Sequence, residues 1–243
     1  MGKQIIIGVP GLWETRSDIV KAIASKSGDF IFAGLVLMNT ATKDSYTLEV
    51  YDRDPGLAHA FEIAGRSLLI KEDIQKIAAH RSTLYVLSSD VSVEDARRML
   101  GVGRALLNAG GLAVKVESTG VAHSAAQWNA YAESNDLFQL YCAFVMLIGG
   151  DEYNYSCGMH NFALPDTSVD CQLGLEEGPD LINRFNYFQL AGSPVLADGD
   201  TFSATVDAPR YRLKKEICEA YEPDHAFHNP FGRWHLVRAI GNQ

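Results

Sequence analysis

The spacing of apolar positions along this chain changes repeatedly between an alternating and a helical pattern, which predicts a protein that mixes strands and helices. The clearest helix spans residues 92–109. Ser92 and Asp95 have the spacing of a capping box, an apolar stripe follows them, and Gly110 and Gly111 end the segment.

The other elements of the first half follow from the same two periods and from the turn residues between them. Strands are predicted at residues 4–9, 30–38, 46–51, 82–88 and 112–117. Further helices are predicted at residues 17–27 with Ser17 as the cap, at 54–64, at 71–80, and from Ser124 through Tyr131. Strands and helices therefore alternate over one sheet.

The second half is richer in aromatic residues and in turn signals. Residues 138–148 and 153–162 are joined by two glycines and an aspartate, which predicts a hairpin, although the first run also has the length of a buried helix. A helix at 179–191 and strands at 201–206, 211–217 and 234–240 complete the chain.

The order of these elements predicts an α+β fold made of two ferredoxin-like halves, each a split β-α-β unit, with mixed sheets and helices packed on one face. The N-terminal α/β half is residues 1–135. The C-terminal half, residues 136–243, has the order strand-strand-helix-strand, and both halves are expected to form one compact unit.

Composition narrows the classes of protein that the chain can belong to. Its 243 residues are 47% hydrophobic and 21% charged, which is typical of a folded domain. Thirty acidic and 21 basic side chains give a net charge of −9, which argues against nucleic-acid binding and fits a basic protein partner, or serves solubility alone.

Membrane insertion and secretion are not expected from this sequence. The longest apolar run, residues 137–148, is shorter than the roughly 20 residues that a membrane span needs, and the apolar run near the N-terminus is too short for a signal peptide. The four cysteines form no C-x-x-C pair, so we expect reduced thiols in a cytoplasmic protein.

Candidate binding residues gather in two polar stretches and one loop. Glu117, His123 and Trp128 belong to the first stretch, where a strand ends and a helix begins; His160, Asn161 and Asp166 belong to the second; Trp13 follows the first strand. Each also has a structural interpretation as a cap, a turn or a buried aromatic residue. Convergence of His123, His160 and the nearby carboxylates on a metal is a minor alternative, and neither a catalytic residue, a metal nor a cofactor is predicted.

Three segments carry a resemblance to a known family. Residues 110–117, 120–128 and 158–166 resemble a family of uncharacterised bacterial proteins defined as a domain of unknown function. The family has no established catalytic residues that could be transferred to this chain. Several uncharacterised families of similar size look like immunity proteins that neutralise the toxins of neighbouring bacteria.

Two functional hypotheses follow, and the sequence favours the first. The first is a non-enzymatic protein-interaction module of immunity type, whose acidic surface masks a basic toxin; the charge and the lack of a recognisable catalytic motif support it. The second is an enzyme, or a binder of a small ligand or metal, with a pocket near Glu117, His123 and His160. The sequence does not predict an oligomeric state.

Overall fold

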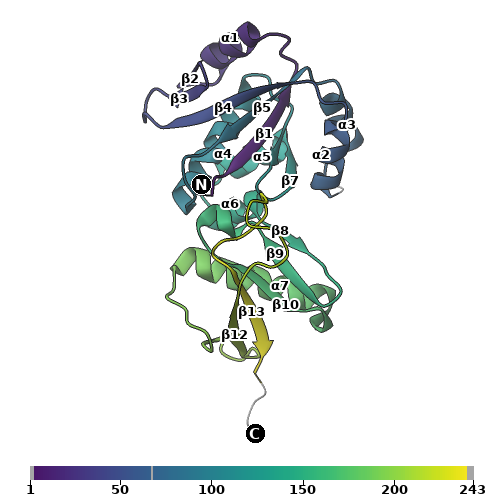
Figure 1. Ribbon diagram of the computed structural model, residues 1–243, viewed down its shortest axis with the longest axis vertical. Helices are drawn as coiled ribbons and strands as arrows, with labels where there is room; N and C mark the ends of the chain where they lie inside the picture. The colour runs from purple at the N-terminus through teal and green to yellow at the C-terminus, as the bar shows by residue number, and fades with distance from the viewer. Residues whose placement is uncertain (1–2, 67, 240–243) are drawn as a thin grey trace. The chain divides into compact units, whose positions relative to one another are not determined.

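The computed structural model describes residues 3–66 and 68–239 and shows an α+β protein (Figure 1). Its described residues form seven α-helices and two sheets. The chain divides into two compact units, Met1–Ala143 (unit 1) and Phe144–Gln243 (unit 2), and each has a sheet of its own.

Unit 1 is built on a seven-stranded sheet in the order β2-β3-β4-β5-β1-β6-β7. The strands are β1 (Ile6–Gly11), β2 (Phe30–Ala33), β3 (Val36–Asn39), β4 (Ser45–Asp52), β5 (Ser82–Leu87), β6 (Ala113–Val116) and β7 (Val121–Ser124). The pairings between the described strands of this sheet are antiparallel. β1 and β4 both pair with β5, so they run parallel to each other on either side of it. β5 and β6 both pair with β1, so they also run parallel to each other on either side of it.

The helices of unit 1 begin where local capping chemistry allows it. They are α1 (Arg16–Lys26), α2 (Leu57–Gly65), α3 (Lys71–Ala78), α4 (Val93–Asn108), α5 (Ala125–Glu133) and α6 (Leu137–Phe144), the last ending at the division between the units. Ser92 caps α4 and Ser124 caps α5, as predicted. The cap of α1 is Thr15 and not Ser17, because Thr15 and Asp18 exchange the bonds of a capping box.

Helices cover both faces of this sheet, which corrects the expectation of helices on one face. α4 packs beside β1, where Gly111 lies against Val9 and Leu106. On the other face α2 and α3 bury Phe61 and Ile77 against Ala113 and Ala122. The reason lies in β6 and β7, where apolar side chains point to both faces and each face needs cover.

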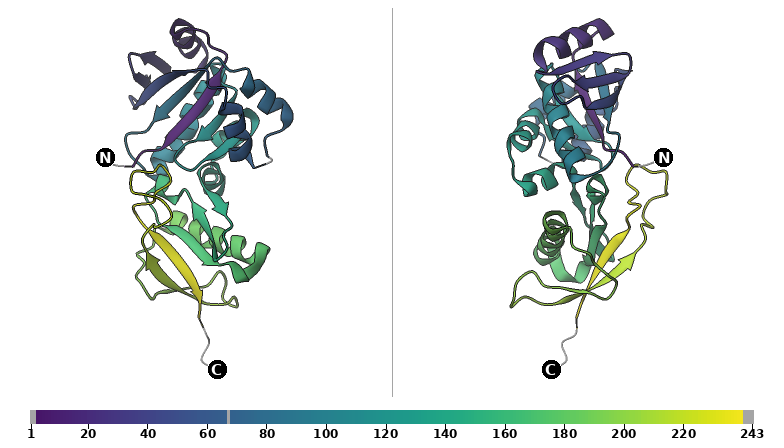
Figure 2. Two further views of the ribbon diagram at one scale, coloured as in Figure 1. Left: turned by 45° about the vertical axis from the view of Figure 1, so that its right-hand side comes forward. Right: turned by 90° about the vertical axis from the view of Figure 1, so that its left-hand side faces the viewer.

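Unit 2 is a six-stranded mixed sheet with one long helix on it. The strand order is β11-β12-β13-β10-β9-β8, with β8 (Met146–Ile148), β9 (Tyr153–Cys157), β10 (Asp166–Asp170), β11 (Thr201–Phe202), β12 (Tyr211–Glu216) and β13 (Arg233–Arg238). Helix α7 (Gly174–Gly192) lies along one face (Figure 2). It buries Leu181, Ile182 and Phe185 against side chains of β10, β12 and β13, so this layer is the core of the unit.

Several predicted elements differ from the structure. Residues 138–148 are helix α6 followed by β8, and not one strand, while residues 30–38 form two strands that turn at Gly34, whose φ is +59°. β7 and β10 were not predicted. β10 and β13 are adjacent parallel neighbours, so unit 2 lacks the intervening strand of a split β-α-β unit. None of the helices in the described residues combines the length and apolarity required to cross a bilayer.

Candidate functional site

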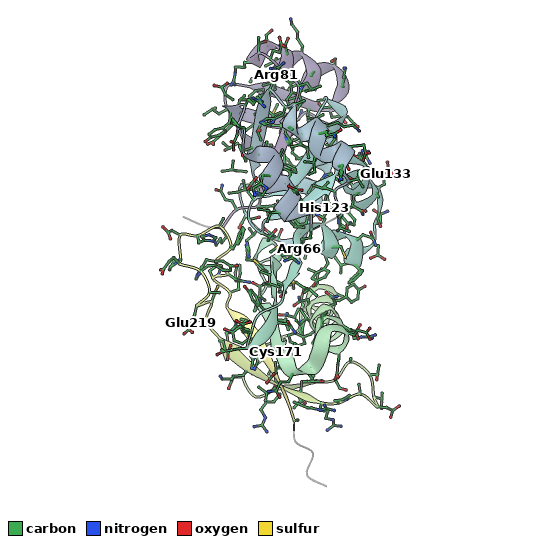
Figure 3. All side chains as sticks on the ribbon, turned by 90° about the vertical axis from the view of Figure 1, so that its right-hand side faces the viewer. Arg66, Arg81, His123, Glu133, Cys171 and Glu219 are labelled. Atoms are coloured by element: carbon green, nitrogen blue, oxygen red, sulfur yellow. The ribbon has the colours of Figure 1, made fainter. Side chains whose placement is uncertain are left out.

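His123 lies in the core of unit 1, where β7 directs it toward the helices (Figure 3). Its Nε2 donates a hydrogen bond to the carbonyl of Ala143 at 3.0 Å, and the rings of Trp128 and Tyr131 lie 5.8 and 5.2 Å from the imidazole. Burial lowers the pKa of His123 to about 4, with the bond to Ala143 opposing the shift. The imidazole is therefore neutral near pH 7 and stabilises a buried carbonyl.

Trp13 and Trp128 are also core residues. Their indole nitrogens donate to the carbonyls of Ala109 and Leu100 at 2.9 and 3.1 Å. Trp128 is fully buried, and a Cβ on Gly103 of α4 would come within 2.4 Å of its indole nitrogen, so this glycine permits the close approach of α4 and α5. Both tryptophans therefore stabilise the fold of unit 1.

Glu117 follows β6 and lies on the sheet face opposite to His123. Its Oε2 accepts a bond from Lys115 Nζ at 2.6 Å, and a Cβ on Gly8 would come within 2.9 Å of both Glu117 and Tyr85. Burial, reinforced by the charge of Glu117, raises the pKa of Tyr85 to about 12. The structure does not bring Glu117 and His123 together.

Asp166 is the centre of a buried polar cluster in unit 2. Its Oδ2 accepts from Asn229 Nδ2 at 2.7 Å, and its Oδ1 accepts from Met159 N at 3.1 Å and Ser156 Oγ at 3.3 Å. Burial raises the pKa of Asp166 to about 6, although these hydrogen bonds act in the opposite direction. The carboxyl group ties β9, β10 and the segment before β13 together.

His160 and Asn161 lie in the short 3₁₀ turn Met159–Phe162, and both are fully buried. The Asn161 amide donates to the carbonyl of Phe144 at 3.5 Å. Asp166 binds the first backbone N–H of this turn, so the structure places these three predicted residues in one region of unit 2. Across residues 3–66 and 68–239, His, Cys, Asp and Glu side chains form no group of three that could hold a metal ion.

The structure shows a polar face in unit 2 that was not predicted from the sequence. It is the sheet face opposite to α7, and we define it by Tyr153, Lys214, Glu216, Arg233 and His235. β12 and β13 pair so that Lys214 lies beside His235 and Glu216 beside Arg233, while Trp234 and Leu236 point to the other side into the core. The alternation of apolar and charged residues in β12 is the signal that could have found it.

The side chains of this polar face contact one another. Glu216 Oε2 accepts from Arg233 at 2.7 Å and its Oε1 accepts from Lys214 at 2.9 Å. The Arg233 guanidinium lies over the ring of Tyr153, 4.5 Å from its centre. A hollow of about 610 Å³ opens here; it is lined by Tyr153, Lys214, Lys215, Glu216, Ile217, Glu219, Arg233 and His235.

A serine-histidine pair lies on the same face, and its role is structural. Ser168 Oγ lies 3.0 Å from His235 Nδ1, and Ser168 is fully buried. Burial lowers the pKa of His235. A nucleophile must reach its substrate, so this pair fixes the imidazole on the sheet and does not form a hydrolytic dyad.

Comparisons of the chain with protein-family models, with curated proteins and with solved structures found no match.

Proposed function

We propose that the protein is a non-enzymatic protein-interaction module of immunity type that binds a basic partner, such as a bacterial toxin domain, in the cytoplasm. The observation that carries the proposal is the exposed side of α7, where acidic and aromatic side chains stand together. The partner surface is defined here as Glu176, Glu177, Asp180, Tyr187 and Phe188.

The helical period places Glu176, Asp180 and Tyr187 opposite to Leu181, Ile182 and Phe185, which face the sheet. Glu177 and Phe188 lie at the border of this surface, where Glu177 accepts a bond from Tyr211 and Phe188 contacts Phe202. Tyr187 and Phe188 remain 41% and 40% exposed and lie next to each other in the helix. Aromatic anchors with charged neighbours are typical of protein interfaces.

The charge of unit 2 gives the chemistry of the partner. Unit 2 has 14 acidic and seven basic side chains, a net charge of −7, while unit 1 has a net charge of only −2. On the partner surface the only neighbouring basic residue of the helix, Arg184, is engaged by Asp180 at 2.7 Å. The negative charge of unit 2 attracts a basic protein, which speeds their encounter, and it complements the charge of that protein once the two are in contact.

The competing hypothesis, an enzyme or ligand binder around Glu117, His123 and His160, has less support. Glu117 and His123 lie on opposite faces of their sheet, and His123 and His160 are buried among core residues.

A cytoplasmic location is supported by the four cysteines, all free thiols.

For unit 1 we propose a ferredoxin-like core. β1, β4, β5 and β6 support it, because their order in the sheet, β4-β5-β1-β6, contains two interlocked split β-α-β units with α1 and α4 in the crossovers. β2, β3, α2, α3 and β7 would then be additions to this core.

Binding to purified basic toxin domains tests the proposal, with cytochrome c as a basic protein outside this class. We expect a toxin domain to bind with one-to-one stoichiometry and the triple variant Glu176→Lys, Asp180→Lys, Tyr187→Ser to weaken binding at least tenfold. The matched control is Glu222→Lys, Asp224→Lys, Tyr51→Ser, which makes the same changes at exposed positions elsewhere. Equal loss in both variants, or toxin domains that bind no better than cytochrome c, would refute the proposal.

A further inference from the structure

We propose that a site on the sheet of unit 1 binds the guanidinium group of a small molecule. The guanidinium site consists of Glu49, Tyr51 and Tyr85, and it lies on the sheet face that carries α2 and α3. It shares no residue with the partner surface on α7. The inference therefore goes beyond the proposed function, because it assigns a ligand class to a second surface of the protein.

Part of this sheet face is left uncovered by the helices. α2 and α3 cover β6 and β7, where they pack on Ala113 and Ala122. Figure 1 shows β4, β5 and β1 in front of α4, with α2 and α3 beside them. Strand alternation places Tyr51 of β4 on the uncovered part, where 54% of its surface is exposed. A ligand from solution can therefore reach this ring.

Glu49 is a carboxylate without a cation. It lies beside Tyr85 in the pairing of β4 with β5, and it accepts a bond from the Tyr51 hydroxyl at 3.1 Å. Among residues 3–66 and 68–239, no Lys, Arg or His side chain forms an ion pair with Glu49, although it is partly buried. A carboxylate that loses hydration without gaining a cation is destabilised, and a positively charged ligand would compensate for this loss.

Two tyrosine rings next to Glu49 favour a planar cation. Tyr51 and Tyr85 lie edge to face, with 5.2 Å between their ring centres. A guanidinium group stacks on an aromatic ring and bonds a carboxylate through paired N–H groups, whereas an ammonium group is a compact and strongly hydrated charge. The exposed ring of Tyr51 and the adjacent carboxylate of Glu49 offer both contacts to one guanidinium group.

The other charged groups near the two rings leave the site negative. Lys115 and Glu117 bind each other at 2.6 Å, so this pair is neutral. Arg53 donates to a carbonyl at the end of α3. Burial raises the pKa of Tyr85 to about 12, and the negative charges of Glu117 and Asp54 act in the same direction. A negative field around exposed aromatic rings attracts a cation.

Titration with agmatine at constant ionic strength, followed by the backbone amide signals in NMR spectra, tests this site. Agmatine carries one guanidinium and one ammonium group, while the diamine cadaverine has a similar length and the same charge but two ammonium groups. We expect agmatine to shift the amide signals of β4 and β5 saturably and to bind at least fivefold more tightly than cadaverine. Equal affinity would overturn the assignment to guanidinium, and no saturable shift at millimolar agmatine would overturn the site itself.

Two double variants locate the binding. Glu49→Gln with Tyr51→Leu removes the carboxylate and the exposed ring, and it should weaken agmatine binding at least fivefold. Glu133→Gln with Tyr187→Leu makes the same changes at exposed positions of α5 and α7, and binding should stay within twofold of the unaltered protein. Tyr51→Phe keeps the ring without its hydroxyl group and should also stay within twofold. If the two double variants bind alike, or if Tyr51→Phe loses binding, the proposed site is wrong.

Discussion

Glu117 and His123, six residues apart in the chain, lie on opposite faces of the first sheet. His123 pairs with Val114, and Glu117 follows the end of β6, three positions after Val114, so the alternation of side chains places the two on different sides. His123 meets Trp128 in the core, whereas Glu117 meets Lys115 beside Gly8. Neighbourhood in sequence therefore does not make a shared site here.

The buried state of His123 predicts an acid-sensitive stability. The folded pKa of about 4 lies below the ordinary value of 6.5, so the unfolded chain binds a proton that the folded protein refuses. The contribution of His123 to the free energy of unfolding is fully present above about pH 6.5. It falls by about 3 kcal/mol as the pH drops to about 4. His123→Gln, which keeps a donor for Ala143, should remove this dependence in urea denaturation.

The matched control is His59→Gln, since His59 is exposed and should leave the pH profile of unfolding unchanged. His123→Ala should lower the free energy of unfolding by about 1 to 3 kcal/mol at pH 7, because the Ala143 carbonyl loses its donor. A His123→Gln protein with the profile of the unaltered chain would show that the imidazole titrates in contact with water.

Asp166 predicts the opposite pH dependence. Its folded pKa of about 6 lies above the ordinary value of 3.8, so the folded protein holds a proton that the unfolded chain has lost. The contribution of Asp166 to the free energy of unfolding is fully present below about pH 4. It declines by about 3 kcal/mol as the pH rises through 6. Asp166→Asn should abolish this decline, measured by urea denaturation at pH 4 and pH 8.

The exposed carboxylate on the same strand provides the control for Asp166. Asp170 caps the turn that follows β10 through a bond from Gln172 N, and an asparagine can accept that bond as well. Asp170→Asn should therefore keep the decline between pH 4 and pH 8. Loss of the decline in both variants would assign it to general charge and not to Asp166.

Local chemistry made some of the fold predictable. Ser92 and the apolar stripe after it predicted α4 because a cap and a helical period act within a few residues of each other. β10 reads Asp166-Thr-Ser-Val-Asp170, a polar segment that becomes a central strand only because other parts of the chain satisfy it. Thr167, for example, bonds Asn186 of α7 and the hydroxyl of Ser156.

The sequence signal in β12 does not show which residues of other strands complete the polar face, for a related reason. Tyr153 and Arg233 are 80 positions apart, and only the pairing of β13 with β10 brings the guanidinium over the ring. The run at residues 138–148 was ambiguous because it is apolar on all sides, so its period does not distinguish a helix from a strand.

Two glycines of α4 give the sharpest comparison of helix propensity with close contact. Gly101 has open space where a Cβ would stand, so Gly101→Ala should raise the free energy of unfolding by up to about 1 kcal/mol through helix propensity alone. Gly103 faces the Trp128 indole, which is fully buried and fixed by its bond to Leu100, so the ring has no room to retreat. Gly103→Ala should lower the free energy of unfolding by about 1 to 3 kcal/mol despite the same gain in propensity.

Urea denaturation of the two variants at pH 7 measures both effects, and the fluorescence of Trp128 should change only in Gly103→Ala. If both variants were stabilised, α5 could shift away from α4 at little cost, and the contact that we assign to Gly103 would not hold the two helices together.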